Sequence, residues 1–463
     1  MQAKQIEWFH GGRSLTAINA IFRPQFTFVD LFAGIGGFRI ALEELGGKCL
    51  GYSEIDRTSI QVYRDNFIRY SNLDEKELGD IQLLNKLPFD VDIIAGGVPC
   101  QPWSIAGKLR GLNDPRGQLW LDTIRVITLN QPKAFILENV RGLTEPRHKE
   151  QFDSILAALS EANYVVKWRV LNAFDFGLSQ DRDRVFIVGI RRDIKGGQNF
   201  QFPEPLNRRP KLFEFVEGVS KKPVVKKKFS PPVLFGDNIP PSRGRFQKTD
   251  ELNDFFLFSD VRNGQTTIHS WDLIATSDRE KQICDIILKN RRKKIYGPKD
   301  GNPIPFDGLK ALISDLEMAE LDRLVEKRIL RFIENRGYEF VNSKISSGIG
   351  GVAKIYLAHA EAIGTLTATG TKVFVATKTF DCQNPERYKI EFIEKIYRPK
   401  HYKEITARDM ARLQGFPEPF ILDNNPSRAK KQLGNAVPVP VVYHIARSLL
   451  VLNPFGNEVQ NSF

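Results

Sequence analysis

Cysteine is scarce in this chain of 463 residues, and the placement of its thiols excludes two common uses. The four cysteines, Cys49, Cys100, Cys284 and Cys382, lie far apart and form no Cys-x-x-Cys pair. Zinc sites and disulfide frameworks need cysteines in close or paired spacings. We therefore expect no metal centre and a reducing, cytosolic setting.

Long apolar runs are also missing from the sequence. No uninterrupted run approaches the roughly 18–20 apolar residues needed to cross a bilayer. The first residues, MQAKQIEWFHGGRS, lack the basic start and the apolar centre of a secretory signal. We expect a protein without membrane contact, whose length predicts two or three domains.

Positive charge is in excess, and it is unevenly distributed. The net charge is +12, and residues 201–360 hold 28 Lys and Arg against 21 Asp and Glu. The other 303 residues hold 39 against 34, so the shorter segment carries more than half of the surplus. An acidic partner such as nucleic acid fits this balance, although a merely solvated surface fits it too.

Short apolar runs alternate with amphipathic stretches from residue 26 to about residue 192. Runs typical of strands occupy 26–32, 48–56, 91–97, 133–140 and 183–190. Helical patterns lie between them at 38–47, 58–67, 118–130 and 148–161. The alternation predicts an α/β domain with a parallel sheet covered by helices on both faces.

The alternation stops near residue 193. Lysine runs at 221–228 and 290–300 and a glycine-rich turn at 346–351 follow, with one long helix-like stretch at 307–337. This composition predicts a separate, irregular domain. Helical patterns return at 406–416 and 435–452.

The middle of the chain is therefore predicted to be an insertion. We expect four parts: an N-terminal extension of 1–25, a catalytic and cofactor-binding domain of 26–192, an inserted domain of 193–403, and a segment of 404–463 that rejoins the first domain.

A glycine-rich turn follows the first predicted strand in DLFAGIGGF (30–38). Glycines between a strand and a helix let the backbone approach a ligand beside the helix N-terminus. Glu54 or Asp56 lies about 20 positions beyond Gly34, a spacing that suits a carboxylate bonded to ribose hydroxyls. The third spaced glycine of a dinucleotide site is absent. The motif favours an adenosine-containing cofactor, the alternative being a tight strand–helix turn.

Two candidate side chains fall at the ends of later strands. Cys100 follows an apolar strand in AGGVPCQPWS, between Pro99 and Pro102, which restrict the backbone on either side. Glu138 ends the strand of KAFILENV and would project from the same edge of the sheet. The ordinary alternatives are a small buried thiol and a solvated acid.

A fourth motif, QDRDR (180–184), places Arg182 and Arg184 two positions apart at the start of a strand. That spacing directs both side chains to one face of the strand. The alternative is a surface ladder of ion pairs with Asp181 and Asp183.

In order and spacing, these motifs resemble the DNA (cytosine-5)-methyltransferases of bacterial modification systems. The matching blocks are FTFVDLFAGIGGFRIALEELGG, YSEID, GDI, VDIIAGGVPCQPWSIAGKLRGLNDPRGQLW, PKAFILENVRGL, LNAFDFGLSQDRDRVFIVGIRR, EITARDMARLQGFPEPF and KKQLGNAVPVPVVYHIA. They cover essentially all of 26–192 and 404–452. The resemblance implies an S-adenosylmethionine-dependent, Rossmann-like mixed sheet with helices on both faces. Residues 193–403 then correspond to the family's smaller, irregular target-recognition domain.

The resemblance also implies a mechanism. Cys100 matches the thiolate that adds to carbon-6 of a cytosine flipped out of duplex DNA, which activates carbon-5 for methylation. Glu138 matches the acid at ring N3 and the exocyclic amine, and Arg184 the arginine at O2. Arg182 matches the arginine that supports the active-site loop.

S-adenosylmethionine is the implied cofactor, S-adenosylhomocysteine the product, and no metal is implied. The residues that match the family's cofactor pocket are Phe32, Gly34, Gly36, Glu54, Ile55, Asp80, Ile81, Pro99 and Asn435. The residues that match DNA contacts on a mobile loop are Ser104, Lys108 and Arg116. The family further implies a monomer in the bacterial cytoplasm, associated with the nucleoid and paired with a possible restriction endonuclease that acts on the same site.

Three other functions remain open at this point. The same chemistry on tRNA is disfavoured by the long insertion, which favours sequence reading on DNA. A catalytically silent DNA-binding protein would have lost part of the catalytic set, which is complete here. A nicotinamide-dependent oxidoreductase has only the glycine turn in its favour. The DNA recognition sequence and the residues that read it are not indicated.

Overall fold

The computed structural model describes residues 25–68, 75–99, 118–222, 253–299, 301–342, 349–368, 372–382 and 384–455. The chain divides into two compact units. The first unit is built from Met1–Pro210, Ala362–Gly370 and Thr406–Phe463, and the second from Lys211–Glu361 and Thr371–Ile405.

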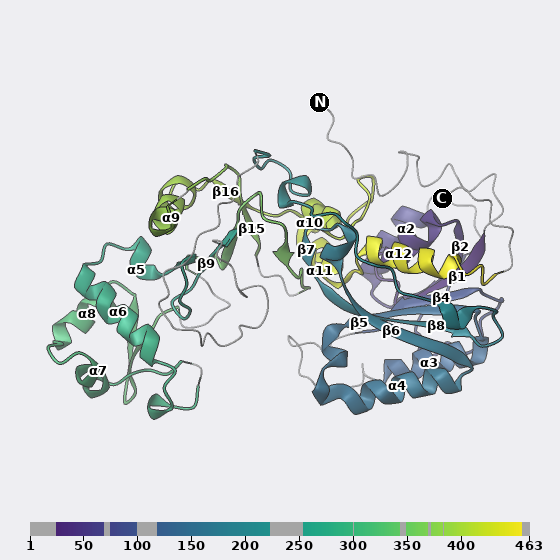
Figure 1. The fold of residues 1–463 in the computed structure, drawn as a ribbon, viewed down its shortest axis with the longest axis horizontal. Coiled ribbons are helices and arrows are strands. Elements are labelled where there is room, and N and C mark those ends of the chain that lie inside the picture. The colour runs from purple at the N-terminus through teal and green to yellow at the C-terminus, as the bar shows by residue number, and fades with distance from the viewer. Residues whose placement is uncertain are drawn as a thin grey trace. The chain divides into compact units, whose positions relative to one another are not determined.

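A seven-stranded mixed sheet forms the centre of the first unit (Figure 1). In order across the sheet, its strands are β3 (Lys76–Glu77), β2 (Gly47–Ser53), β1 (Phe26–Leu31), β4 (Ile93–Gly97), β5 (Ala134–Val140), β8 (Asp183–Arg191) and β6 (Tyr164–Asn172). The first five strands are parallel, and β8 is antiparallel to both of its neighbours. The implied mixed α/β fold is confirmed.

The alternation alone predicted a wholly parallel sheet, and that was wrong for β8. Only residues 173–182 separate β6 from β8. A parallel crossover needs a dozen or more residues, usually a helix, whereas a shorter connection returns the chain antiparallel.

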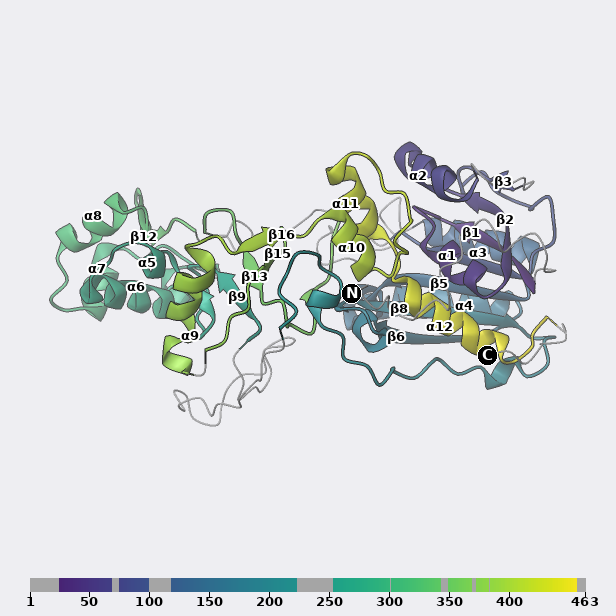
Figure 2. The same cartoon turned by 90° about the horizontal axis from the view of Figure 1, so that it is seen from above.

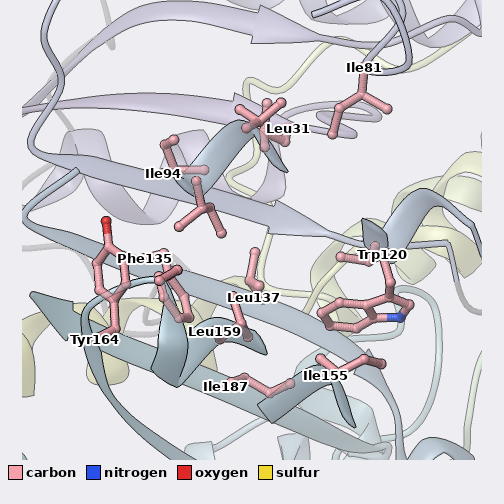
Figure 3. Packing of buried hydrophobic residues seen from close by; sticks show 14 of the residues in the cluster. Leu31, Ile81, Ile94, Trp120, Phe135, Leu137, Ile155, Leu159, Tyr164 and Ile187 are labelled. Atoms are coloured by element: carbon pink, nitrogen blue, oxygen red, sulfur yellow. The ribbon is translucent and has the colours of Figure 1, made fainter. Parts of the chain in front are cut away.

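Helices cover both faces of this sheet (Figure 1). On one face lie α3 (Leu119–Asn130) and α4 (Lys149–Glu161), and on the other α1 (Gly37–Glu44) packs against α12 (Val439–Leu450). Figure 3 shows the core beneath α3 and α4, formed by Leu31, Ile81, Ile94, Trp120, Phe135, Leu137, Ile155, Leu159, Tyr164 and Ile187.

Side-chain caps set the starts of several helices in the first unit. Asp56 caps the N-terminus of α2 (Arg57–Phe67), where its side chain accepts hydrogen bonds from the backbone N–H groups of Thr58 and Ser59. Thr406 caps α10 (Ala407–Leu413), and Asn425 caps α11 (Pro426–Asn435), which lies beside α10 (Figure 2). The predicted helices at 406–416 and 435–452 are confirmed as α10 and α12, and α11 was not predicted.

The second unit contains a five-stranded sheet. In order, its strands are β10 (Thr267–Ile268), β9 (Phe255–Phe258), β13 (Lys354–Tyr356), β15 (Phe374–Ala376) and β16 (Tyr402–Glu404). Helix α9 (Pro385–Phe392) packs on it, and the rings of Phe256 and Phe392 stack 3.6 Å apart.

A group of helices with a β-hairpin completes the second unit. Figures 1 and 2 show these helices gathered at one end of it. The elements are α5 (Ser270–Leu273), α6 (Asp278–Asn290), α7 (Phe306–Leu312), α8 (Met318–Glu326), β11 (Leu330–Ile333) and β12 (Gly337–Phe340).

The prediction of one long helix at 307–337 was wrong. The stretch forms two short helices and most of the hairpin. Arg328, Asn335 and Gly337 have φ angles of 55°, 59° and 96°, a left-handed backbone that no α-helix contains. The apolar spacing is helical on both sides of these turns, and a pattern of spacing alone does not locate them.

In the part of the chain that the structure describes, no helix is both long and apolar enough to span a bilayer.

Two further short strands, β7 (Gln180–Asp181) and β14 (Ile363–Gly364), pair in parallel and bring residues 362–368 into the first unit.

Candidate active site

The carboxyl ends of three parallel strands meet at one edge of the large sheet. Leu31, near the end of β1, pairs with Gly96 of β4, and Gly97 pairs with Glu138 of β5. The loops that follow these strands therefore start side by side. In open α/β sheets this edge is where ligands bind.

The turn after β1 is held by the carboxylate of Glu54. Its Oε2 accepts a hydrogen bond from the N–H of Gly34 at 2.8 Å, and its Oε1 accepts those of Ile55 and Asp56 at 2.7 and 2.8 Å. Glu54 therefore lies against the glycine turn, as its spacing from Gly34 requires, and its predicted bond to ribose hydroxyls stays a prediction.

The backbone of the same turn needs its glycines. Phe32, Gly34 and Gly36 have φ angles of 54°, 55° and 90°. At Gly36 an added Cβ would lie 2.3 Å from the ring of Phe67, so both conformation and space require glycine. Ile55, whose side chain is 69% exposed, lies at the open side of the turn.

A third segment joins this edge from the strand at the end of the sheet. Ser53 donates a hydrogen bond to the carbonyl of Gly79 at 2.7 Å, which places Asp80 and Ile81 next to the end of β2. Ile81 is buried, whereas Asp80 is half-buried and accepts a hydrogen bond from the N–H of Gln82. Both predicted residues therefore lie on the Glu54 side of the edge.

Glu138 and Arg184 form a nearly enclosed ion pair at the end of β5. The Nε of Arg184 lies 2.7 Å from Oε1 of Glu138, and the two side chains are 12% and 11% exposed. Burial raises the pKa of Glu138 above the usual range of a glutamate, and the charges of Arg184 and Arg182 oppose that rise. The pair is neither a solvated cap nor a surface ladder.

The exit of β4 is tied to the same strand. The N–H of Val98 donates to the carbonyl of Glu138, and the buried side-chain amide of Asn139 donates to the carbonyl of Val98, both at 3.2 Å. Pro99, half-buried, is the last described residue before Cys100. Cys100 itself, Ser104, Lys108 and Arg116 lie outside the described residues.

Arg182 takes different partners from Arg184. Its guanidinium is buried and donates to the carbonyls of Leu366, Gly434 and Ala436 at 2.8, 3.1 and 2.8 Å. These contacts join three distant parts of the first unit. They also hold the backbone on both sides of Asn435, whose own side chain is exposed.

Sequence analysis missed two buried glutamines in this junction. The side chain of Gln180 donates to the carbonyl of Leu413 at 2.9 Å and accepts from the N–H of Leu366 at 3.0 Å. Gln414 donates to the carbonyl of Leu433 at 2.8 Å. Both lie inside the motifs QDRDR and RLQGFP, where a long amide beside apolar residues could have indicated a buried connector.

With this geometry in place, the chain can be compared with known proteins. The family model of C-5 cytosine-specific DNA methylase matches residues 26–450. The chain belongs to this family. It is therefore a DNA cytosine-5 methyltransferase, as the motifs implied.

Individual methyltransferases resemble the chain over nearly its whole length. Type II methyltransferases M.HgiCII and M.HgiBI from Herpetosiphon aurantiacus are each 44% identical to it, over 92% and 94% of this chain and 97% and 99% of theirs. Type II methyltransferase M.BanI from Aneurinibacillus aneurinilyticus is 32% identical over 94% of this chain and 97% of its own.

Proposed function

We propose that this methyltransferase acts on carbon-5 of a cytosine flipped out of duplex DNA, through a covalent adduct at Cys100. The observation that carries the proposal is the enclosed Glu138–Arg184 pair next to the exit of β4, where the chain continues into Cys100. A thiolate that adds to carbon-6 of the base makes carbon-5 electron-rich. Carbon-5 then takes the methyl group, and loss of the carbon-5 proton to solvent, return of the N3 proton to Glu138 and expulsion of the thiolate restore the aromatic ring.

The other side chains have separate roles in the proposal. Glu138 donates a proton to ring N3 and accepts a hydrogen bond from the exocyclic amine, and its burial, which raises the pKa of the carboxyl, favours the protonated form that this role needs. Arg184 holds Glu138 and the O2 atom of the base. Arg182 is a positioning residue, because its guanidinium donates to the backbone carbonyls of Leu366, Gly434 and Ala436.

S-adenosylmethionine supplies the methyl group as an electrophile when it is bound. The residues assigned to it are Phe32, Gly34, Gly36, Glu54, Ile55, Asp80, Ile81, Pro99 and Asn435. The residues at the glycine turn fit such a cofactor. The carboxylate of Glu54, the glycines Gly34 and Gly36 and the exposed side chain of Ile55 lie together there. No metal has a role in the proposal.

The DNA contacts are assigned in part to Ser104, Lys108 and Arg116 and in part to the inserted domain of 193–403. The restriction-modification role comes from the relatives, which are named type II methyltransferases. We propose that methylation protects the DNA of a bacterial cell from an endonuclease with the same target. The enzyme acts as a cytoplasmic monomer near the nucleoid.

Base-resolution bisulfite sequencing tests the proposal. The protein is expressed in a host without cytosine methylation, and the DNA is sequenced after bisulfite treatment. Protected cytosines that recur in one short motif are expected, and they would also identify the target. Soluble protein that binds S-adenosylmethionine yet protects no cytosine would contradict the proposal, and a parallel assay on tRNA would then identify the alternative substrate.

A further inference from the structure

Within the second unit, residues 270–342 begin and end at one buried carboxylate. Asp260, after β9, is fully buried and accepts hydrogen bonds from the N–H and the hydroxyl of Ser270 at 2.8 and 2.5 Å. The side-chain amide of Asn342 lies 3.2 Å from the same hydroxyl. The two ends of the segment therefore meet, as expected for an inserted module.

The order of elements in this segment is that of a winged helix-turn-helix. Helix α6 is followed by Ile304, which pairs with Tyr338 through two backbone hydrogen bonds of 2.9 Å. Helices α7 and α8 come next, and the antiparallel hairpin of β11 and β12 ends the module. The single pairing at Ile304 thus adds a third, minimal strand to the hairpin.

The module has a hydrophobic core of its own. The buried cluster takes side chains from every one of these elements, including Ile283 and Ile287 from α6, Leu309 from α7 and Leu321 from α8. Ion pairs also connect α6 to the region of α8. Lys327 lies 2.7 Å from Glu280, and Arg279 lies 3.0 Å from Glu320.

In a helix-turn-helix, the second helix of the pair enters the major groove of DNA. The outward charges of α8 oppose that placement. Its exposed charged residues are Asp322, Arg323 and Glu326, and the exposed Glu317 precedes its first turn. With Arg328, which is exposed just beyond the helix, three carboxylates face two guanidinium groups, a net negative charge that phosphates repel, so we do not assign α8 to a groove.

The positive charge of the module lies elsewhere, in residues 289–299, which we call the basic loop. The basic loop contains six Lys and Arg and no Asp or Glu. The exposed basic residues are Lys289, Arg292, Lys293, Lys294 and Lys299. Among the described residues, no carboxylate forms an ion pair with Lys293 or Lys294.

The buried side chain of Asn302 shapes the backbone of the basic loop. Its amide group contacts the carbonyls of Arg291, Gly297 and Lys299 at 3.2, 3.1 and 2.8 Å, and its Oδ1 accepts from the N–H of Lys299. The loop is therefore held in a defined conformation, which reduces the entropy lost when its lysines bind a ligand.

We infer that residues 270–342 are a winged-helix module that binds the phosphates of the DNA substrate with its basic loop instead of with α8. The inference rests on the proposed function, because duplex DNA is the ligand. The contact positions the enzyme on DNA without reading bases.

The test compares two variants of the full-length enzyme with equal loss of charge. In the first, Lys293→Gln and Lys294→Gln neutralise the basic loop. In the matched control, Lys48→Gln and Lys195→Gln neutralise exposed lysines at the start of β2 and after β8, at the edge of the sheet opposite the candidate site. Equilibrium binding is measured from about 50 to 200 mM salt, a range over which phosphate contacts change affinity strongly, on duplexes with and without the target sequence.

Loss of two phosphate contacts should reduce the slope of log K against log salt by about 1.8 and weaken binding on the order of 10- to 100-fold near 0.1 M salt. The loss should be equal on both duplexes, and the control should bind like the wild type. An unchanged slope, an equal loss in the control, or a loss confined to the target duplex would overturn the inference. Wild-type methylation of the same duplex is measured in parallel, so that failure of the proposed function is recognised separately.

Discussion

The Nε of Arg184 lies 2.7 Å from the carboxylate of Glu138, and protein encloses both side chains almost completely. The two residues come from neighbouring antiparallel strands, β8 and β5. Burial raises the pKa of Glu138, and the positive charge of Arg184 is the largest influence against that rise. Arg184 therefore adjusts the protonation of Glu138 as well as its position.

Arg184→Gln should move the alkaline limb of the pH–rate profile to higher pH. Removing the positive neighbour raises the pKa of Glu138 further, so that its active, protonated form persists to higher pH. A nearby opposite charge changes a carboxyl pKa by about 1–3, and a shift of the limb by about one pH unit is expected. The rate should also fall by about 100-fold, since a buried donor to the base is lost.

The matched control for this profile is Arg169→Gln. Arg169 also pairs with a carboxylate, that of Glu204 at 3.0 Å, but these side chains are 44% and 78% exposed. Its profile should equal that of the wild type, because exposed pairs contribute little. If the alkaline limb stays in place in Arg184→Gln, protonation of Glu138 does not determine it.

Cys100→Ser should abolish methylation and retain binding of S-adenosylmethionine. A hydroxyl is a far weaker nucleophile than a thiolate near neutral pH, whereas the assigned cofactor residues stay intact. Methyl transfer to duplex DNA and equilibrium cofactor binding are measured on the same preparation. Cys382→Ser is the control and should leave the rate unchanged, and substantial turnover by Cys100→Ser would remove Cys100 from its role.

The parts of the fold predicted from sequence are those with strong local patterns. The runs at 26–32, 91–97 and 133–140 are β1, β4 and β5, because strands buried on both faces are continuously apolar. The antiparallel β8 depends on a short connection to β6, a strand that carries exposed residues such as Trp168 and Arg169. The mixed pattern of polar and apolar residues in β6 does not distinguish this strand from a loop.

The site shows the same division between local motifs and long-range partners. The contact between Gly34 and Glu54 spans 20 positions and follows from one βαβ unit. The partners of Arg182, by contrast, are carbonyls 184 to 254 positions away. Any residue offers a backbone carbonyl, so no residue type indicates such a partner.

Arg182→Gln and Asn435→Ala should distinguish a residue that positions the cofactor pocket from a residue that contacts the cofactor. Arg182→Gln removes the guanidinium donor from the carbonyls of Leu366 and Gly434, at about 1–3 kcal/mol each, and should lower both stability and cofactor affinity. Asn435→Ala removes an exposed side chain, so stability should change by less than about 0.5 kcal/mol while cofactor affinity falls. Denaturant unfolding and cofactor titration of both variants measure the difference. Equal stability of the two variants would contradict the positioning role of Arg182.

Gly36→Ala should destabilise the first unit more than Gly34→Ala. Both glycines are left-handed, which costs another residue roughly 1–2 kcal/mol, but only at Gly36 would the new Cβ meet the ring of Phe67, 2.3 Å away. At Gly34 the nearest atom is 3.9 Å away. The free energies of unfolding of both variants, measured by denaturant titration, should therefore differ by about 1–3 kcal/mol, the usual cost of overpacking.

A double-mutant cycle with Phe67→Leu identifies the cause of that difference. If the ring clash is responsible, Gly36→Ala and Phe67→Leu together should destabilise the protein by less than the sum of the single changes, with a coupling of about 0.5–3 kcal/mol. The same cycle with Gly34→Ala should be additive, because no ring atom lies near its added Cβ. Additivity at Gly36 would mean that backbone conformation alone requires glycine there, and that the ring of Phe67 yields without cost.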